Sequence, residues 1–247
     1  RMLTRLPHFH RVIFVSLGLI MILLLASCAA NPPASAQGDT NESHRSTLTS
    51  PTTQPDTNTN TTPTPKVCVE NAGSIQDLTI PSSVLDDDIK VKLYLPACYD
   101  EKSTKRYSVL YMLHGQNSQE DQWVRVGLFA KMDELIQQGT VEPFIIVLPN
   151  ELRSNLEAFQ SLFGDAVLKD VIPYVDEHFN TCNERVCRAI GGLSRGGNWA
   201  VHLGFEHPEL FKAVGAHSTP LFYGEMINIT RAVEDPDRVG LLPVVYI

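Results

Sequence analysis

The sequence predicts an α/β fold, with a mostly parallel sheet covered by helices on both faces. Three observations lead to this fold class. Short apolar runs are typical of buried strands, stretches with apolar positions at helical spacing lie between them, and the two kinds alternate along the chain. The expected strands are 76–80, 89–95, 107–113, 144–149, 188–193, 212–217 and 242–247, and the expected helices are 121–138, 157–179 and 195–207.

Each element has its own local signal. The first two strands flank a turn that contains three consecutive aspartates at 86–88. The runs 107–113 and 144–149 are almost continuously apolar, as expected for parallel strands buried on both faces. The helix at 121–138 has Leu128, Met132, Leu135 and Ile136 at helical spacing. In the helix at 157–179 we assign to the core Leu162, Phe163, Val167, Val171, Ile172 and Val175.

The run at 188–193 leads into Gly192-Leu-Ser194-Arg-Gly196, a Gly-x-Ser-x-Gly pattern, and a helix-compatible stretch follows it. This strand–turn–helix context is typical of a nucleophile elbow, in which a strained turn lifts a serine hydroxyl clear of the sheet. Side chains in place of the two glycines would crowd the turn and the approaching substrate. We therefore predict that Ser194 is a nucleophile. The alternative is an ordinary glycine-rich turn between a strand and a helix.

A second element lies upstream, where the strand at 107–113 ends in His114-Gly115-Gln116-Asn. Acyl transfer needs two backbone N–H donors aimed at the developing oxyanion. In this architecture one donor follows the serine and the other comes from the loop after an earlier strand. We therefore predict that the main-chain amides of Gln116 and Arg195 form the oxyanion hole. The alternative is that His114-Gly115 is only a turn that ends a strand.

Four segments together resemble the putative-esterase group of α/β-hydrolases: Tyr-Met-Leu-His-Gly-Gln at 111–116, the strand and asparagine at 144–150, Gly-Gly-Leu-Ser-Arg-Gly-Gly at 191–197 and His-Pro-Glu-Leu-Phe at 207–211. This group is similar to enterochelin esterases, feruloyl and acetyl-xylan esterases, S-formylglutathione hydrolases and mycolyltransferases. The resemblance implies an α/β-hydrolase fold and hydrolysis of carboxylic esters through an acyl-enzyme. We expect no cofactor, and no metal, because no His/Cys cluster has ligand spacing.

The resemblance also implies a catalytic triad in the chain order serine, acid, histidine. The acid normally follows the strand expected at 242–247, and the histidine comes later. Because the sequence stops at Ile247, we expect that the C-terminal part of the fold, with the triad acid and histidine, is missing. His202 and His217 follow Ser194 closely, but their positions suit a general base poorly. We interpret His217 as a residue that lines the pocket or stabilises the fold.

Further residues are predicted to contact the substrate. They include His114 and Gly115 of the loop described above, and His217. Trp123 follows this loop and would wall an aromatic or acyl pocket, although core packing explains it equally well. Glu151 follows the strand at 144–149, on the edge where ligands bind in such sheets, and a solvated loop residue is the alternative.

Residues 1–27 are typical of a lipoprotein signal peptide. A basic start with three arginines precedes an apolar stretch at 12–25, whose 14 residues are too few for a comfortable transmembrane helix. Leu-Ala-Ser-Cys at 25–28 resembles a bacterial lipobox, which predicts that Cys28 carries lipid and anchors the protein to a membrane. Ordinary secretory cleavage just beyond Cys28 is the alternative.

Residues 28–66 are rich in Thr, Pro, Asn and Ser and contain no aromatic residue. Such a stretch buries too little apolar surface to fold, so we expect a disordered tether. The catalytic domain would then be 67–247. The predicted location is the extracytoplasmic side of a bacterial membrane, in the cell envelope.

Cysteine usage agrees with export. The chain has five cysteines, and four remain if Cys28 carries lipid, an even number in an oxidising compartment. We expect disulfides between Cys68 and Cys98 and between Cys182 and Cys187. Free buried thiols are the alternative.

The formal net charge of −8 and the acidic pI of about 5.4 argue against a nucleic-acid partner. We therefore predict a membrane-anchored serine esterase whose partner is a small-molecule, carbohydrate or lipid ester. One alternative is an acyltransferase that passes the acyl group from the same acyl-enzyme to a sugar or lipid. The other is a non-catalytic binding lipoprotein with the same fold.

Overall fold

The structure is a computed structural model, and it describes residues 70–247. The predicted signal peptide, the lipid site at Cys28, the tether and Cys68 lie outside the described residues. These expectations therefore stay predictions.

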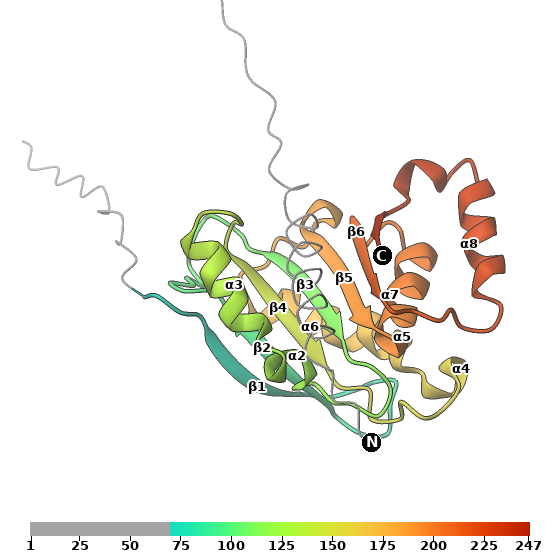
Figure 1. Ribbon diagram of the computed structural model, residues 1–247, viewed down its shortest axis with the longest axis horizontal. Coiled ribbons are helices and arrows are strands. Elements are labelled where there is room, and N and C mark those ends of the chain that lie inside the picture. The colour runs from blue at the N-terminus through green and yellow to red at the C-terminus, as the bar shows by residue number, and fades with distance from the viewer. Residues whose placement is uncertain (1–69) are drawn as a thin grey trace, which may run out of the picture. The chain divides into compact units, whose positions relative to one another are not determined.

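A seven-stranded sheet forms the centre of the described part, in the order β1-β2-β4-β3-β5-β6-β7 (Figure 1). The neighbours from β4 to β7 pair in parallel, whereas β2 runs antiparallel to both β1 and β4. This confirms the predicted, mostly parallel sheet. The strands are β1 (Ser74–Ile80), β2 (Ile89–Leu95), β3 (Ser108–Leu113), β4 (Phe144–Pro149), β5 (Arg188–Leu193), β6 (Ala213–His217) and β7 (Val244–Tyr246).

Helices cover both faces of this sheet, as predicted. Along β3, Val109 and Tyr111 belong to one core cluster and Leu110 and Met112 to another, because successive side chains of a strand point to opposite faces. The second cluster is closed by α2 (Gln122–Arg125) and α3 (Leu128–Gln137). The first is closed by α6 (Ile172–His178) and α7 (Arg195–Glu206). In Figure 1, α3 lies in front of the sheet and α6 behind it.

Two expected helices are interrupted. The helix at 121–138 is divided at Gly127, which has a φ of 81°. The stretch 157–179 divides at Leu162, which has a φ of 55° and is 44% exposed. The predicted place of Leu162 in the core is therefore wrong. Phe163 and the other residues assigned to that core are buried. The pieces of this stretch are α4 (Ala158–Ser161), α5 (Phe163–Ala166), a π-helical turn η1 (Val167–Val171) and α6.

One helix was not expected. It is α8 (Glu225–Glu234), which lies at the right-hand side of Figure 1 and packs on α7. The remaining short 3₁₀ turns are η2 (Arg185–Cys187) and η3 (Val239–Leu241). Within residues 70–247 no helix has both the length and the apolar character needed to cross a membrane.

The expected disulfide between Cys182 and Cys187 is present, with 5.8 Å between the two Cα atoms. It closes a short loop that leads directly into β5, the strand that carries the candidate nucleophile. Cys98 is also disulfide-bonded. Its predicted partner, Cys68, lies outside the described residues.

Candidate active site

Ser194 occupies a strained turn between β5 and α7, with φ 53° and ψ −113°. Such a backbone conformation is costly for a residue other than glycine and is typical of a nucleophile elbow. The Ser194 N–H donates to the carbonyl oxygen of His217 at 2.8 Å, and its carbonyl accepts from the Asn198 N–H at 3.0 Å. Ser194 is partly exposed, and its hydroxyl has no hydrogen-bond partner among residues 70–247.

The elbow packs directly against the loop that follows β3. A Cβ on Gly196 would lie 2.4 Å from the carbonyl oxygen of Leu113 and 2.6 Å from that of His114, so only glycine fits there. A Cβ on Gly115 would lie 3.9 Å from the Ser194 Cβ. Since β3 and β5 are parallel neighbours, their ends meet at one edge of the sheet. The two predicted parts of the site, the Ser194 elbow and the loop at 114–117, therefore lie together at this edge.

Two main-chain amides near Ser194 are free to bind a ligand. The Gly115 N–H is occupied, because it donates to the Oε1 atom of Gln122 at 2.9 Å. The next amide, that of Gln116, lies in an exposed turn and donates to no acceptor in the described part of the chain. Arg195 is the first residue of α7, where amides have no acceptor within the helix and where the helix dipole favours negative charge. These are the two amides predicted to hold the oxyanion.

The His114 ring has a different setting from the one predicted. It is buried, and its Nε2 atom accepts a hydrogen bond from the Glu151 N–H at 2.8 Å. A main-chain N–H can only donate, so the proton is on Nδ1, which donates to the Gly115 carbonyl oxygen at 2.8 Å. Both ring nitrogens are thus used to fix the loop. Neither ring nitrogen of His114 is left for the predicted contact with a substrate.

Trp123 lies in the core, which was the alternative to a pocket wall. It is 2% exposed, and its indole N–H donates to the Leu113 carbonyl oxygen at 3.1 Å. It belongs to the core cluster beneath α3. The structure therefore gives Trp123 a packing role at the base of the loop after β3.

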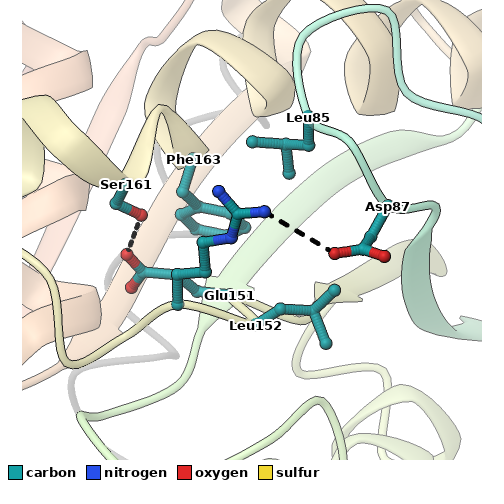
Figure 2. Close-up of a pocket in the computed structure, with 7 residues that line it drawn as sticks. Leu85, Asp87, Glu151, Leu152, Ser161 and Phe163 are labelled. Carbon is teal, nitrogen blue, oxygen red and sulfur yellow. Dashed lines mark hydrogen bonds and ion pairs between the residues drawn. The ribbon is translucent and has the colours of Figure 1, made fainter.

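Glu151 has a buried carboxylate that is occupied by protein partners. Arg195 donates to it twice, from Nη2 to Oε1 at 2.6 Å and from Nε to Oε2 at 2.8 Å. The Trp199 indole N–H donates to Oε2 at 3.1 Å, and the Ser161 hydroxyl donates to Oε1. Figure 2 shows Ser161 and Glu151 turned toward one another. Since the side chain of Glu151 is only 3% exposed, this geometry does not support the predicted contact with substrate.

His217 ends β6 directly beside the elbow, in register with Leu193. Its ring is partly buried, and this burial lowers its pKa, so the neutral form is favoured near neutral pH. The ring makes no hydrogen bond within residues 70–247. The predicted contact of the His217 ring with a substrate stays a prediction.

A polar cavity of about 490 Å³ adjoins the loop after β3. Asn117 and Ser118 of that loop line one side, and Ser154 and Asn155 of the segment after β4 line the other. A hydrogen bond of 3.2 Å from the Asn117 N–H to the Ser154 hydroxyl joins the two sides. Amide and hydroxyl groups of this kind suit a ligand that is itself rich in hydroxyl groups.

Comparison with known proteins decides the family. Residues 82–237 match the family model described as Putative esterase. The chain belongs to this family. The curated relatives of the chain include an endo-1,4-beta-xylanase/feruloyl esterase from Xylanibacter ruminicola, 31% identical over 177 residues, which cover 66% of the chain and 24% of that protein. The chain thus spans about a quarter of this relative.

Solved structures confirm the α/β-hydrolase fold of the chain. A feruloyl esterase module from Clostridium thermocellum, in complex with sinapinate, has a TM-score of 0.58 and 25% identity over 69% of this chain and 63% of that one. A ferulic acid esterase from Anaeromyces mucronatus, in complex with ferulic acid, has a TM-score of 0.55 and 26% identity over 60% and 58%. The family and these relatives support carboxylic ester hydrolase activity.

Proposed function

We propose that this protein is a serine esterase that cleaves carboxylic esters through an acyl-enzyme on Ser194. One observation carries the proposal. A serine in a strained, partly exposed turn packs against the loop of Gln116, beside two unoccupied main-chain amides. A nucleophile and two donors on one edge of a sheet are the parts that acyl transfer requires.

In the proposed mechanism, the Ser194 hydroxyl oxygen attacks the carbonyl carbon of the ester, while a histidine that acts as general base takes the hydroxyl proton. The carbonyl oxygen becomes negatively charged and accepts hydrogen bonds from the amides of Gln116 and Arg195. The C–O bond to the alcohol then breaks, and the histidine returns the proton to the departing oxygen. Water attacks the acyl-enzyme by the same route, which releases the acid and restores Ser194.

We further propose that the substrate is a hydroxycinnamate ester of a sugar hydroxyl. The relatives in complex with ferulic acid and sinapinate support the acid part. The polar cavity next to Asn117 supports the alcohol part, because its amides and hydroxyls suit a sugar. An aromatic acid would then lie on the other side of Ser194, toward His217.

The proposed location is the extracytoplasmic side of a bacterial membrane, with the protein held by lipid on Cys28. The lipobox-like segment at 25–28 and the disulfide between Cys182 and Cys187 support it, because disulfides persist in oxidising compartments. The Cys28→Ser variant should move from the membrane fraction to the soluble fraction and should lose labelling by a fatty-acid probe. Equal labelling of the variant and the wild type would contradict this location.

The activity is tested with the full-length protein on methyl ferulate and p-nitrophenyl acetate. We expect hydrolysis of both esters and its loss in Ser194→Ala. The matched control is Ser103→Ala, which changes a partly exposed serine whose hydroxyl, within residues 70–247, accepts only a local hydrogen bond from the Lys105 N–H. Hydrolysis by Ser194→Ala at the rate of the wild type would contradict the proposal.

A further inference from the structure

We infer that Glu151 is a positioning residue that sets the two oxyanion amides relative to one another. This inference rests on the proposed function, since it concerns the same site. It assigns a catalytic purpose to the ion pair between Glu151 and Arg195. The inference follows from two sets of contacts that Glu151 makes. One set leads to the Arg195 amide, and the other leads to the Gln116 amide.

The first set of contacts leads to the elbow. The Glu151 carboxylate binds the Arg195 guanidinium through two hydrogen bonds of 2.6 and 2.8 Å, and the Trp199 indole N–H adds a third of 3.1 Å. A bidentate pair fixes the orientation of the guanidinium as well as its position. Arg195 and Trp199 both belong to α7. The carboxylate therefore holds the first turn of this helix, where the Arg195 amide is the proposed donor.

The second set of contacts leads to the loop after β3. The main-chain N–H of Glu151 donates to His114 Nε2 at 2.8 Å, and the same ring donates from Nδ1 to the Gly115 carbonyl oxygen. The following residue, Gln116, supplies the other proposed donor. Glu151 thus holds one donor through its side chain and the other through its main chain.

Stability alone explains this arrangement poorly. The Arg195 and Glu151 side chains are 10% and 3% exposed, and such pairs often stabilise a protein no more than apolar residues of similar volume. The contacts do, however, fix the distance between two amides, one at the start of α7 and the other in the loop after β3. Oxyanion donors work only if this distance is fixed before the reaction begins. The pair therefore fits a role in positioning.

Two variants test the inference in the full-length protein. Glu151→Gln removes the charge of the carboxylate, and Arg195→Lys keeps the positive charge but loses the bidentate geometry. Because the amides act on charge that develops in the transition state, kcat should fall about 10–100-fold with little change in KM. If Glu151→Gln fails to fold, Arg195→Lys carries the test, because it leaves no uncompensated charge.

The chain offers a matched control at the other end of β5. Arg188 donates to Asp176 at 2.6 Å, and the Arg188 side chain is 3% exposed. The strand separates this pair from Ser194 by roughly 17–20 Å. The Asp176→Asn variant should lose stability, as the other variants do, and should keep the kcat of the wild type.

Amide hydrogen exchange gives a second measurement that does not depend on turnover. Glu151→Gln and Arg195→Lys should exchange faster than the wild type in 194–198, where the Glu151 carboxylate is bound, and Asp176→Asn should not. Unchanged exchange in 194–198 would overturn the inference, and so would equal acceleration by Asp176→Asn. If the wild type hydrolyses no ester, the proposed function fails and the exchange data still decide whether the Glu151 side chain positions the start of α7.

Discussion

The Ser194 main-chain N–H donates a hydrogen bond of 2.8 Å to the carbonyl oxygen of His217, the last residue of β6. This bond continues the ladder between β5 and β6 by one step beyond the end of β5. A strained turn persists only where its surroundings hold it in place. The elbow is held by β6 on one side and by the loop after β3 on the other, so each of these contacts has a measurable consequence.

The Gly196→Ala variant should lose most of its activity. The new Cβ would lie 2.4 Å from the Leu113 carbonyl oxygen, so the elbow or the loop has to move. A displacement of about 1 Å in a catalytic group costs on the order of 100-fold in rate, and we expect a loss of that size in kcat/KM, together with a lower Tm. The control is Gly240→Ala, where a Cβ meets nothing within 4 Å. An active Gly196→Ala protein would show that the close packing is not needed.

The Trp123→Phe variant should reduce stability and leave substrate preference unchanged. The change removes the hydrogen bond to the Leu113 carbonyl oxygen and leaves a small cavity, which should cost about 2 kcal/mol in the free energy of unfolding. Denaturant unfolding measures this loss. The ratio of kcat/KM for methyl ferulate and p-nitrophenyl acetate should match that of the wild type. A changed ratio would restore the interpretation of Trp123 as a pocket wall.

His202 should make stability depend on pH. Its Nδ1 atom hydrogen-bonds the Glu225 carboxylate at 2.9 Å, and this bond raises the pKa of His202 above its ordinary value of 6.5. A group with a raised pKa in the folded state stabilises it fully below the unfolded pKa, and loses this effect as the pH rises through the folded pKa. The Tm difference between wild type and His202→Gln should therefore be largest near pH 5.5 and should shrink above pH 7.

The His217 ring acts in the opposite direction. Burial lowers its pKa, so its contribution to stability is present above its unfolded pKa and is lost as the pH falls. Because His217 is the same in the wild type and in His202→Gln, the difference in Tm isolates His202. A difference that stays constant from pH 5.5 to 8 would contradict the predicted effect of Glu225.

The disulfide between Cys182 and Cys187 should stabilise the strand that carries Ser194. Replacing both cysteines by serine should reduce the free energy of unfolding by about 2 kcal/mol, since the bond closes a very short loop. Thermal unfolding of the double variant and of the wild type measures the loss. Alkylation of the unreduced protein under denaturing conditions should leave both cysteines unmodified. Modification of either one would show that the bond is absent.

Much of the sheet could be predicted because its strands are buried on both faces. The residues of β4 are apolar throughout and all buried, so the sequence alone marks the strand and both of its ends. The same holds for Ser194, because the glycines that the elbow requires lie within two residues of it. In each case the physical constraint is local and leaves a local pattern.

The α8 helix was not predicted, although Met226, Ile229 and Val233 recur at helical spacing. Met226, Ile227 and Val233 are 59%, 57% and 47% exposed, whereas Ile229 packs on the core and Ala232 is buried. Glu225 of α8 is buried although its side chain is charged. The partner of Glu225 is His202, which lies 23 positions earlier. Hydrophobic periodicity does not reveal such a contact between polar residues that lie far apart in the chain.

The positions of His114 and Glu151 could be predicted, but their contacts could not. Glu151 lies 44 positions from Arg195 and 37 from His114. Nothing in the residues around 151 distinguishes a carboxylate that binds a substrate from one that binds a distant arginine. The sequence therefore located the edge of the sheet where the site lies, and only the folded chain shows how its polar groups are paired.

The most direct test of the account is covalent labelling of the full-length protein with a fluorophosphonate, followed by peptide mass mapping. Such a reagent reacts with an activated serine and stays bound, so slow or fast release of an acyl group does not affect the result. We expect one equivalent of label, located on Ser194, with loss of ester hydrolysis in proportion to labelling and no label in Ser194→Ala. Label on a different residue, or full hydrolysis after complete labelling of Ser194, would contradict the role of Ser194 as the nucleophile.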